Sequence, residues 1–197
     1  RDIFLRSLCV MAVMLFFTAT GARSGNMTLA VNALFMQLYL LYSHFMDGFA
    51  YAGEALVGKY AGAADKHSLR RCVSHLFAWG WSLAAIFAFA YGVFNHEVMS
   101  LFSDKPEVVA FAAAYRWWIA LAPIAGMAAF IWDGVFVGLT ATRQMLLSLA
   151  GATAAYFAIY FLFPFSDANN SLWTAFLIYL AVRGVILWLC FARKNEY

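Results

Sequence analysis

Residues 29–60 read LAVNALFMQLYLLYSHFMDGFAYAGEALVGKY, a long apolar run whose acids are Asp47 and Glu54. A helix of this length extends for about 48 Å at about 1.5 Å per residue. The hydrocarbon core of a bilayer is only about 30 Å thick. The sequence therefore predicts a membrane-spanning helix that tilts or projects beyond the bilayer.

Four polar side chains of this run share one helical face. His44, Asp47, Tyr51 and Glu54 follow one another at spacings of three, four and three residues, which places them in a single stripe. Ionisable residues at membrane depth normally face a bundle interior or a water-filled cavity, because lipid offers them no partner. We expect this stripe to look inward.

The composition indicates an all-α, polytopic membrane protein. Of the 197 residues, 65% are hydrophobic and 12% are charged, whereas soluble domains are about 45–50% apolar and about 25% charged. The basic residues are too scattered to form a nucleic-acid-binding stripe, so the bilayer is the expected partner. The cysteines and histidines lack metal-ligand spacing, and we predict neither a metal site nor a cofactor.

Six apolar segments separated by short polar turns are predicted to cross the membrane as one lobe that occupies residues 1–197. Their approximate bounds are 3–20, 27–60, 72–94, 107–140, 145–163 and 172–191. An even number of spans places both ends of the chain on one side. With that side in the cytoplasm, ten lysines and arginines lie inside and three lie outside, which is the expected positive-inside bias.

The two longest segments both carry an Asp-Gly pair in the half that this topology places near the cytoplasm. The pairs are Asp47-Gly48 and Asp133-Gly134. A glycine beside the acid lets another helix or a substrate approach the backbone closely. We therefore expect a cavity between these two helices.

Three stretches carry a resemblance to a known family: DGFAYAGEALVGKYAGAAD at 47–65, LFSDKPEVV at 101–109 and WDGVFVGLTATRQM at 132–145. They resemble motifs of the multidrug and toxic compound extrusion (MATE) family, in particular its DinF-like branch. The resemblance implies twelve helices in two lobes, with a substrate cavity between the lobes and proton- or sodium-driven alternating access. This chain is similar to the C-terminal lobe, so the N-terminal lobe is an expected partner. A bacterial plasma membrane is the expected location.

By that likeness, Asp133 matches an acid implicated in coupling to a cation. From the residues alone, it is either a protonatable or cation-binding residue or a structural acid near the cytoplasmic interface. From the residues alone, Asp47 is either part of the transport pathway or the ion-pair partner of Arg183 or Arg70. Glu54 and Arg183 are interpreted as a gate or as members of structural ion pairs.

Further candidates for the transport pathway lie on the long helix predicted at 27–60. Tyr51 belongs to the polar stripe. Asn32 and Gln37 lie in its outer half and are expected either to contact a substrate or to form hydrogen bonds between helices.

The leading functional hypothesis is secondary active efflux of a small, often cationic, organic solute in exchange for H⁺ or Na⁺. One alternative is a related flippase of lipid-linked oligosaccharides, which would carry more cationic residues on its cavity-facing helices. Another is a non-transporting membrane subunit, which gives no reason for two Asp-Gly pairs. The sequence has no HExxH or complete GxSG motif of an intramembrane protease, so no enzymatic activity is predicted.

Overall fold

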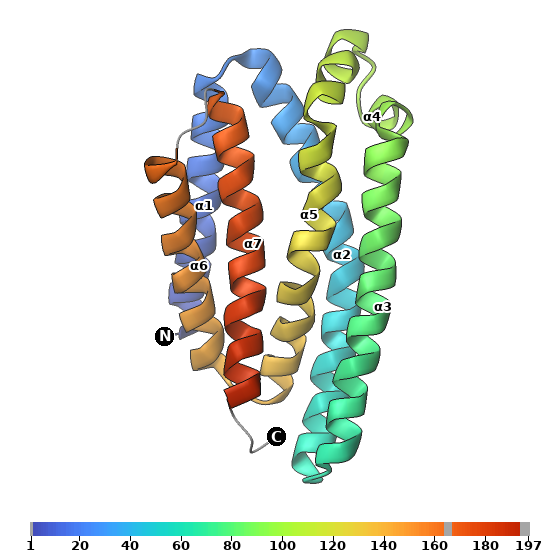
Figure 1. Ribbon diagram of the computed structural model, residues 1–197, viewed down its shortest axis with the longest axis vertical. Coiled ribbons are helices and arrows are strands. Elements are labelled where there is room, and N and C mark those ends of the chain that lie inside the picture. The colour runs from blue at the N-terminus through green and yellow to red at the C-terminus, as the bar shows by residue number, and fades with distance from the viewer. Residues whose placement is uncertain (1, 164–166, 194–197) are drawn as a thin grey trace.

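The computed structural model describes residues 2–163 and 167–193, and in those ranges the secondary structure is entirely helical. The helices in chain order are α1 (Asp2–Arg23), α2 (Asn26–Gly62), α3 (Lys66–Val93), α4 (Asn95–Phe102), α5 (Pro106–Gly138), α6 (Thr142–Leu162) and α7 (Ala168–Arg193) (Figure 1). Six of them, all but α4, are long and apolar enough to cross a membrane. The predicted all-α fold with six membrane-spanning helices is confirmed.

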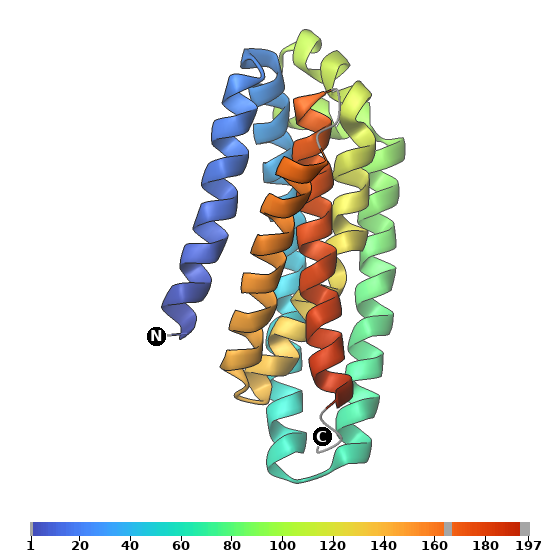
Figure 2. The same ribbon diagram turned by 60° about the vertical axis from the view of Figure 1, so that its left-hand side comes forward.

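Helix α5 is the centre of the bundle. In the most apolar stretch of α5, 67% of the residues are buried, whereas the corresponding share in every other spanning helix is at most 39%. It packs against α2, α3 and α7, while α6 packs on α7 and α1 packs mainly on α6 (Figure 1). Helix α1 consequently lies at the edge of the bundle, as the turned view shows (Figure 2).

Helices α2 and α3 form a hairpin that projects beyond the other helices at the bottom of Figure 1. We call this end of the bundle the basic end, after Lys59, Lys66, Arg70 and Arg71 on the hairpin. Helix α3 begins six residues before the predicted start at 72, because the Asp65 carboxylate caps it by accepting a hydrogen bond from the Ser68 backbone N–H at 3.0 Å. The hydrogen bonds from Ser68 hold the pKa of Asp65 below its usual range.

The short helix α4 is absent from the predicted spans, which leave residues 95–106 as a polar loop. Asn95 and Met99 are buried at a spacing of four residues and turn the segment into a helical cap on the bundle. Helix α5 then begins at Pro106, whose fixed φ suits the first helical position.

Candidate functional site

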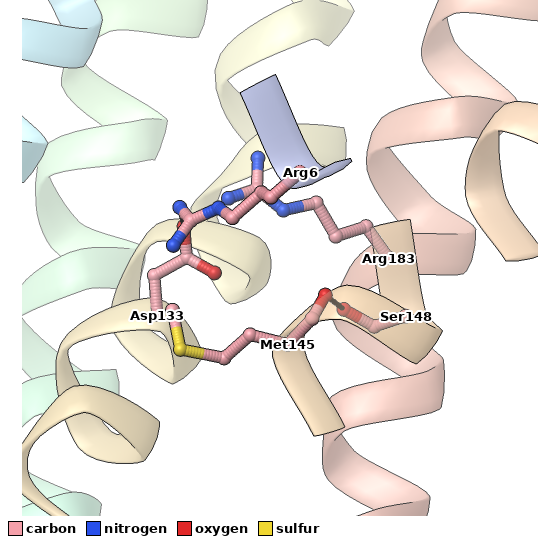
Figure 3. Close-up of polar contacts among 5 residues, drawn as sticks. All are labelled: Arg6, Asp133, Met145, Ser148 and Arg183. Atoms are coloured by element: carbon pink, nitrogen blue, oxygen red, sulfur yellow. Dashed lines mark hydrogen bonds and ion pairs between the residues drawn. The ribbon is translucent and has the colours of Figure 1, made fainter. Parts of the chain in front are cut away.

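Asp133 is the meeting point of three helices. Its Oδ2 atom accepts a hydrogen bond from the Arg6 guanidinium of α1 at 2.7 Å and another from the Arg183 guanidinium of α7 (Figure 3). The Asp133 and Arg183 side chains are 14% and 11% exposed, and that of Arg6 is 31% exposed. We call Arg6, Asp133 and Arg183 the charge cluster.

The charge cluster has one positive charge in excess, because two guanidinium groups share one carboxylate. The second oxygen, Oδ1 of Asp133, is buried and has no hydrogen-bond partner among the described residues. Tyr39 and Tyr179 lie within electrostatic range of both Arg183 and Asp133, so a polar neighbourhood extends from the cluster into the bundle.

Helix α6 contributes Met145 and Ser148 next to the cluster (Figure 3). The Met145 side chain extends toward Asp133 (Figure 3). The Met145 backbone carbonyl accepts a hydrogen bond from the Ser148 hydroxyl at 2.8 Å. A cavity of about 170 Å³ lies beside Arg6 and is lined also by Asp2, Val137, Thr142 and Met145. The more exposed of the two arginines therefore has open space next to it.

The pairing expected for Arg183 is present, but its partner is Asp133 and not Asp47. Asp47 is half-buried and forms no ion pair within the described part of the chain. The two Asp-Gly pairs are therefore not equivalent, since only one of the two acids is held by arginines.

We predicted a cavity between α2 and α5 at the Asp-Gly pairs, and this prediction is wrong. Gly134 and Gly138 of α5 lie directly against the α2 backbone, so that a Cβ atom at Gly138 would stand 2.6 Å from the Glu54 carbonyl oxygen. At Gly134 it would collide with the carbonyl oxygen of Ala50. Gly48, by contrast, has open space where a Cβ would lie. The glycines of α5 serve close packing of two helices.

The polar stripe of α2 does not face the interior of this lobe. His44, Tyr51 and Glu54 are exposed, Tyr51 by 69%, whereas the buried face of α2 carries Tyr42, Met46 and Val57 among others. Glu54 forms no ion pair among the described residues. That the stripe faces a water-filled cavity stays a prediction, and such a cavity would lie outside this lobe.

Of the two side-chain amides in the outer half of α2, Asn32 forms hydrogen bonds with α7. Its side chain is 3% exposed, donates to Asn169 Oδ1 at 2.8 Å and accepts from Trp173 Nε1 at 2.9 Å. Asn32 thus fastens α2 to α7, in agreement with the hydrogen-bonding alternative. Gln37 lies on the exposed face of α2.

Sequence reasoning missed the role of Arg6. An arginine near the start of an apolar span is easily read as a side chain that reaches the interface. The available signal was topological: the charge bias places Arg6 at the same end of the bundle as Asp133 and Arg183.

Comparisons with known proteins agree on one family. The MatE family model matches residues 3–162. DNA damage-inducible protein F of Escherichia coli (strain K12) is 32% identical over 187 residues, which are 95% of this chain and 40% of that protein. Protein DETOXIFICATION 45, chloroplastic, of Arabidopsis thaliana is 24% identical over 182 residues, with 91% of this chain and 32% of that protein covered.

The fold is also similar to a solved structure, described as the inward-facing conformation of a multidrug resistance MATE family transporter of the MOP superfamily. The TM-score is 0.74 at 14% identity, covering 98% of this chain and 45% of that chain. The chain spans less than half the length of the relatives it matches.

Proposed function

The chain belongs to the MatE family, and we propose that it acts as one lobe of a secondary active transporter that exports a small organic solute. Six apolar helices in the fold of half a MATE transporter support this proposal, as does the similarity to less than half of each longer relative. In this proposal a second six-helix lobe completes the transporter in a bacterial plasma membrane. The basic end lies in the cytoplasm, and so do both termini.

The single observation that carries the proposal is the charge cluster. A charge inside a membrane costs several kcal/mol unless it is partnered or hydrated, so ionisable groups there are rare and usually functional. Asp133 holds two arginines from helices that are distant in sequence, and α1 packs mainly on α6 instead of on α5. Neutralising Asp133 would therefore loosen the attachment of α1 to the centre of the bundle.

We propose that this loosening is the coupling step of alternating access, with H⁺ as the ion that acts at Asp133. Proton binding removes the negative charge and releases both guanidinium groups at once. Na⁺ is disfavoured at this place, because it requires several oxygen ligands and the two guanidinium groups beside the carboxylate offer no acceptor atom. Coupling to Na⁺ elsewhere in the full protein is the alternative that the ion-gradient experiment below separates.

The exposed polar stripe of α2 fits the same proposal. Glu54 lies on a face that this lobe does not cover, and Asp47 of the same stripe is half-buried. Contact with lipid tails is unfavourable for acids at membrane depth. We propose that Asp47 and Tyr51 face the water-filled cavity between the two lobes, where they would contact the solute. Gln37 is exposed as well and is a further candidate for that cavity.

The test is solute efflux from proteoliposomes that contain the full-length protein, driven separately by a pH gradient and by a Na⁺ gradient. We expect the pH gradient to drive efflux, and Asp133→Asn to abolish that efflux while the protein still inserts and purifies as a monodisperse species. Asp104→Asn is the matched control, because Asp104 is an exposed acid in the α4–α5 connection. Undiminished efflux by the Asp133→Asn protein would remove the charge cluster from the coupling step.

A second candidate, the flippase of lipid-linked oligosaccharides, is favoured by one observation. The charge cluster has two arginines for one acid, and Arg6 adjoins a cavity. A flippase is expected to carry more cationic residues on its cavity-facing helices, and Arg6 is the arginine of the cluster that adjoins open space, beside Asp2. Scrambling of a fluorescent polyprenyl-phosphate sugar in the same proteoliposomes, without efflux of any soluble solute, would favour this candidate over the exporter.

A further inference from the structure

A groove runs between α2 and α3 at the basic end, on the opposite side of α5 from the charge cluster. Its volume is about 530 Å³. The α3 wall presents Ser68, His75 and Trp79, and the α2 wall presents Phe49, Leu56 and Tyr60. Each set follows spacings of seven and then four residues, so each wall is one continuous helical face.

The groove changes from apolar to basic along its length. Trp79 is 66% exposed, and the adjacent Gly80 packs against Met127 and Ile131 in the apolar part of α5. Ser68 lies eleven residues earlier in the same helix, about 16 Å away along the helix axis at about 1.5 Å per residue. One end of the groove thus lies beside the hydrocarbon core, and the other lies toward the head-group region.

The head-group end is positively charged. Arg71 lines the groove, and the Lys59 ammonium lies 6.0 Å from the ring centre of Tyr60, which also lines it. Between residues 54 and 75 the hairpin has four lysines and arginines and only two acids. Of these acids, Asp65 is occupied in capping α3, and Glu54 lies on a different face of α2 from Leu56 and Tyr60.

We propose that this groove binds an anionic phospholipid of the inner leaflet. The phosphate lies at Arg71 and His75, and the upper acyl chain lies against Trp79 and Phe49. A soluble phosphate compound would leave the apolar end uncovered, and a protein segment would have to enter the membrane to reach it. Basic pockets between membrane helices on the cytoplasmic side suit anionic head groups in charge and position.

The experiment measures lipid retention by the full-length protein in detergent, with phosphatidylglycerol and phosphatidylcholine offered separately and retained lipid counted by native mass spectrometry. We expect Arg71→Gln to lower phosphatidylglycerol retention about fivefold, the effect of one basic residue near an anionic head group. Arg70→Gln is the matched control, since Arg70 is exposed on α3 but does not line the groove. It should lower retention much less than Arg71→Gln does.

A second measurement does not depend on the arginine variants. Brominated phosphatidylglycerol should quench the emission of Trp79, obtained as the difference between the wild-type protein and Trp79→Phe, and brominated phosphatidylcholine should not. Equal losses of retention in Arg70→Gln and Arg71→Gln would overturn the proposal, because the attraction would then be diffuse. Equal quenching by the two lipids would overturn it as well, since the groove would then be merely apolar.

Discussion

Gly134 of α5 lies against Ala50 of α2 with no room for a side chain between the two backbones. This contact lies one residue after Asp133, so the same turn of α5 that presents the acid to α1 and α7 presses its other face onto α2. The position of the charge cluster therefore depends on the packing of α2 against α5.

Replacing Gly134 by alanine should destabilise the bundle, because the added methyl group meets backbone atoms that cannot rotate away. We expect the free energy of unfolding to fall by about 1–3 kcal/mol, as for overpacked cores. Titration of the full-length protein with sodium dodecyl sulfate measures it. Gly48→Ala is the control: it has open space and should raise stability by about 0.5–1 kcal/mol. Equal effects of the two variants would show that α2 and α5 do not pack this closely.

Asn32→Ala should weaken the attachment of α2 to α7, because it leaves Trp173 Nε1 and Asn169 without their partner. Hydrogen bonds between membrane helices contribute about 0.6–2 kcal/mol, so we expect a loss of that size in the same titration. Gln37→Ala, on the exposed face of the same helix, should change stability by less than about 0.5 kcal/mol. An Asn32→Ala protein as stable as the wild type would argue against this network.

The partner of Arg183 can be identified by a double-mutant cycle. Asp133→Asn should cost about 3–5 kcal/mol, since it leaves two guanidinium groups without their partner. Arg183→Gln should cost less, because Asp133 keeps its ion pair with Arg6. The double variant should be less destabilised than the sum by about 0.5–3 kcal/mol. Arg183→Gln combined with Asp47→Asn should be additive within about 0.5 kcal/mol. Coupling in the second cycle and additivity in the first would restore the pairing of Arg183 with Asp47.

The number and order of the spanning helices were predictable from the sequence, because length and hydropathy are properties of each segment by itself. The apolar run at 29–60 lies within α2, and its excess length appears as the projecting hairpin. Helix α4 was missed because its eight residues are too short and too mixed to show a period, and its two buried side chains find their place only against the bundle.

The candidate site was predictable only in part. Asp133 stood out because an acid in an apolar span requires a partner, and Arg183 stood out for the same reason. Their pairing, and the contact of Arg6 with Asp133, depend on how α1, α5 and α7 are arranged around one another. The periodicity within a single helix does not contain that information. The Asp-Gly pairs look alike in sequence, yet Gly134 meets Ala50 and Gly48 meets open space, a difference that tertiary packing alone creates.

The most direct test of the central claim, that the charge of Asp133 fastens α1 to α7, is the distance between these helices in a bilayer. Spin labels at Leu8 of α1 and Val185 of α7, both on exposed positions, report it by pulsed electron paramagnetic resonance in full-length protein whose native cysteines are replaced. We predict one narrow distance distribution with Asp133 and with the control Asp104→Asn, and a longer, broader one with Asp133→Asn. Identical distributions in all three proteins would contradict the claim.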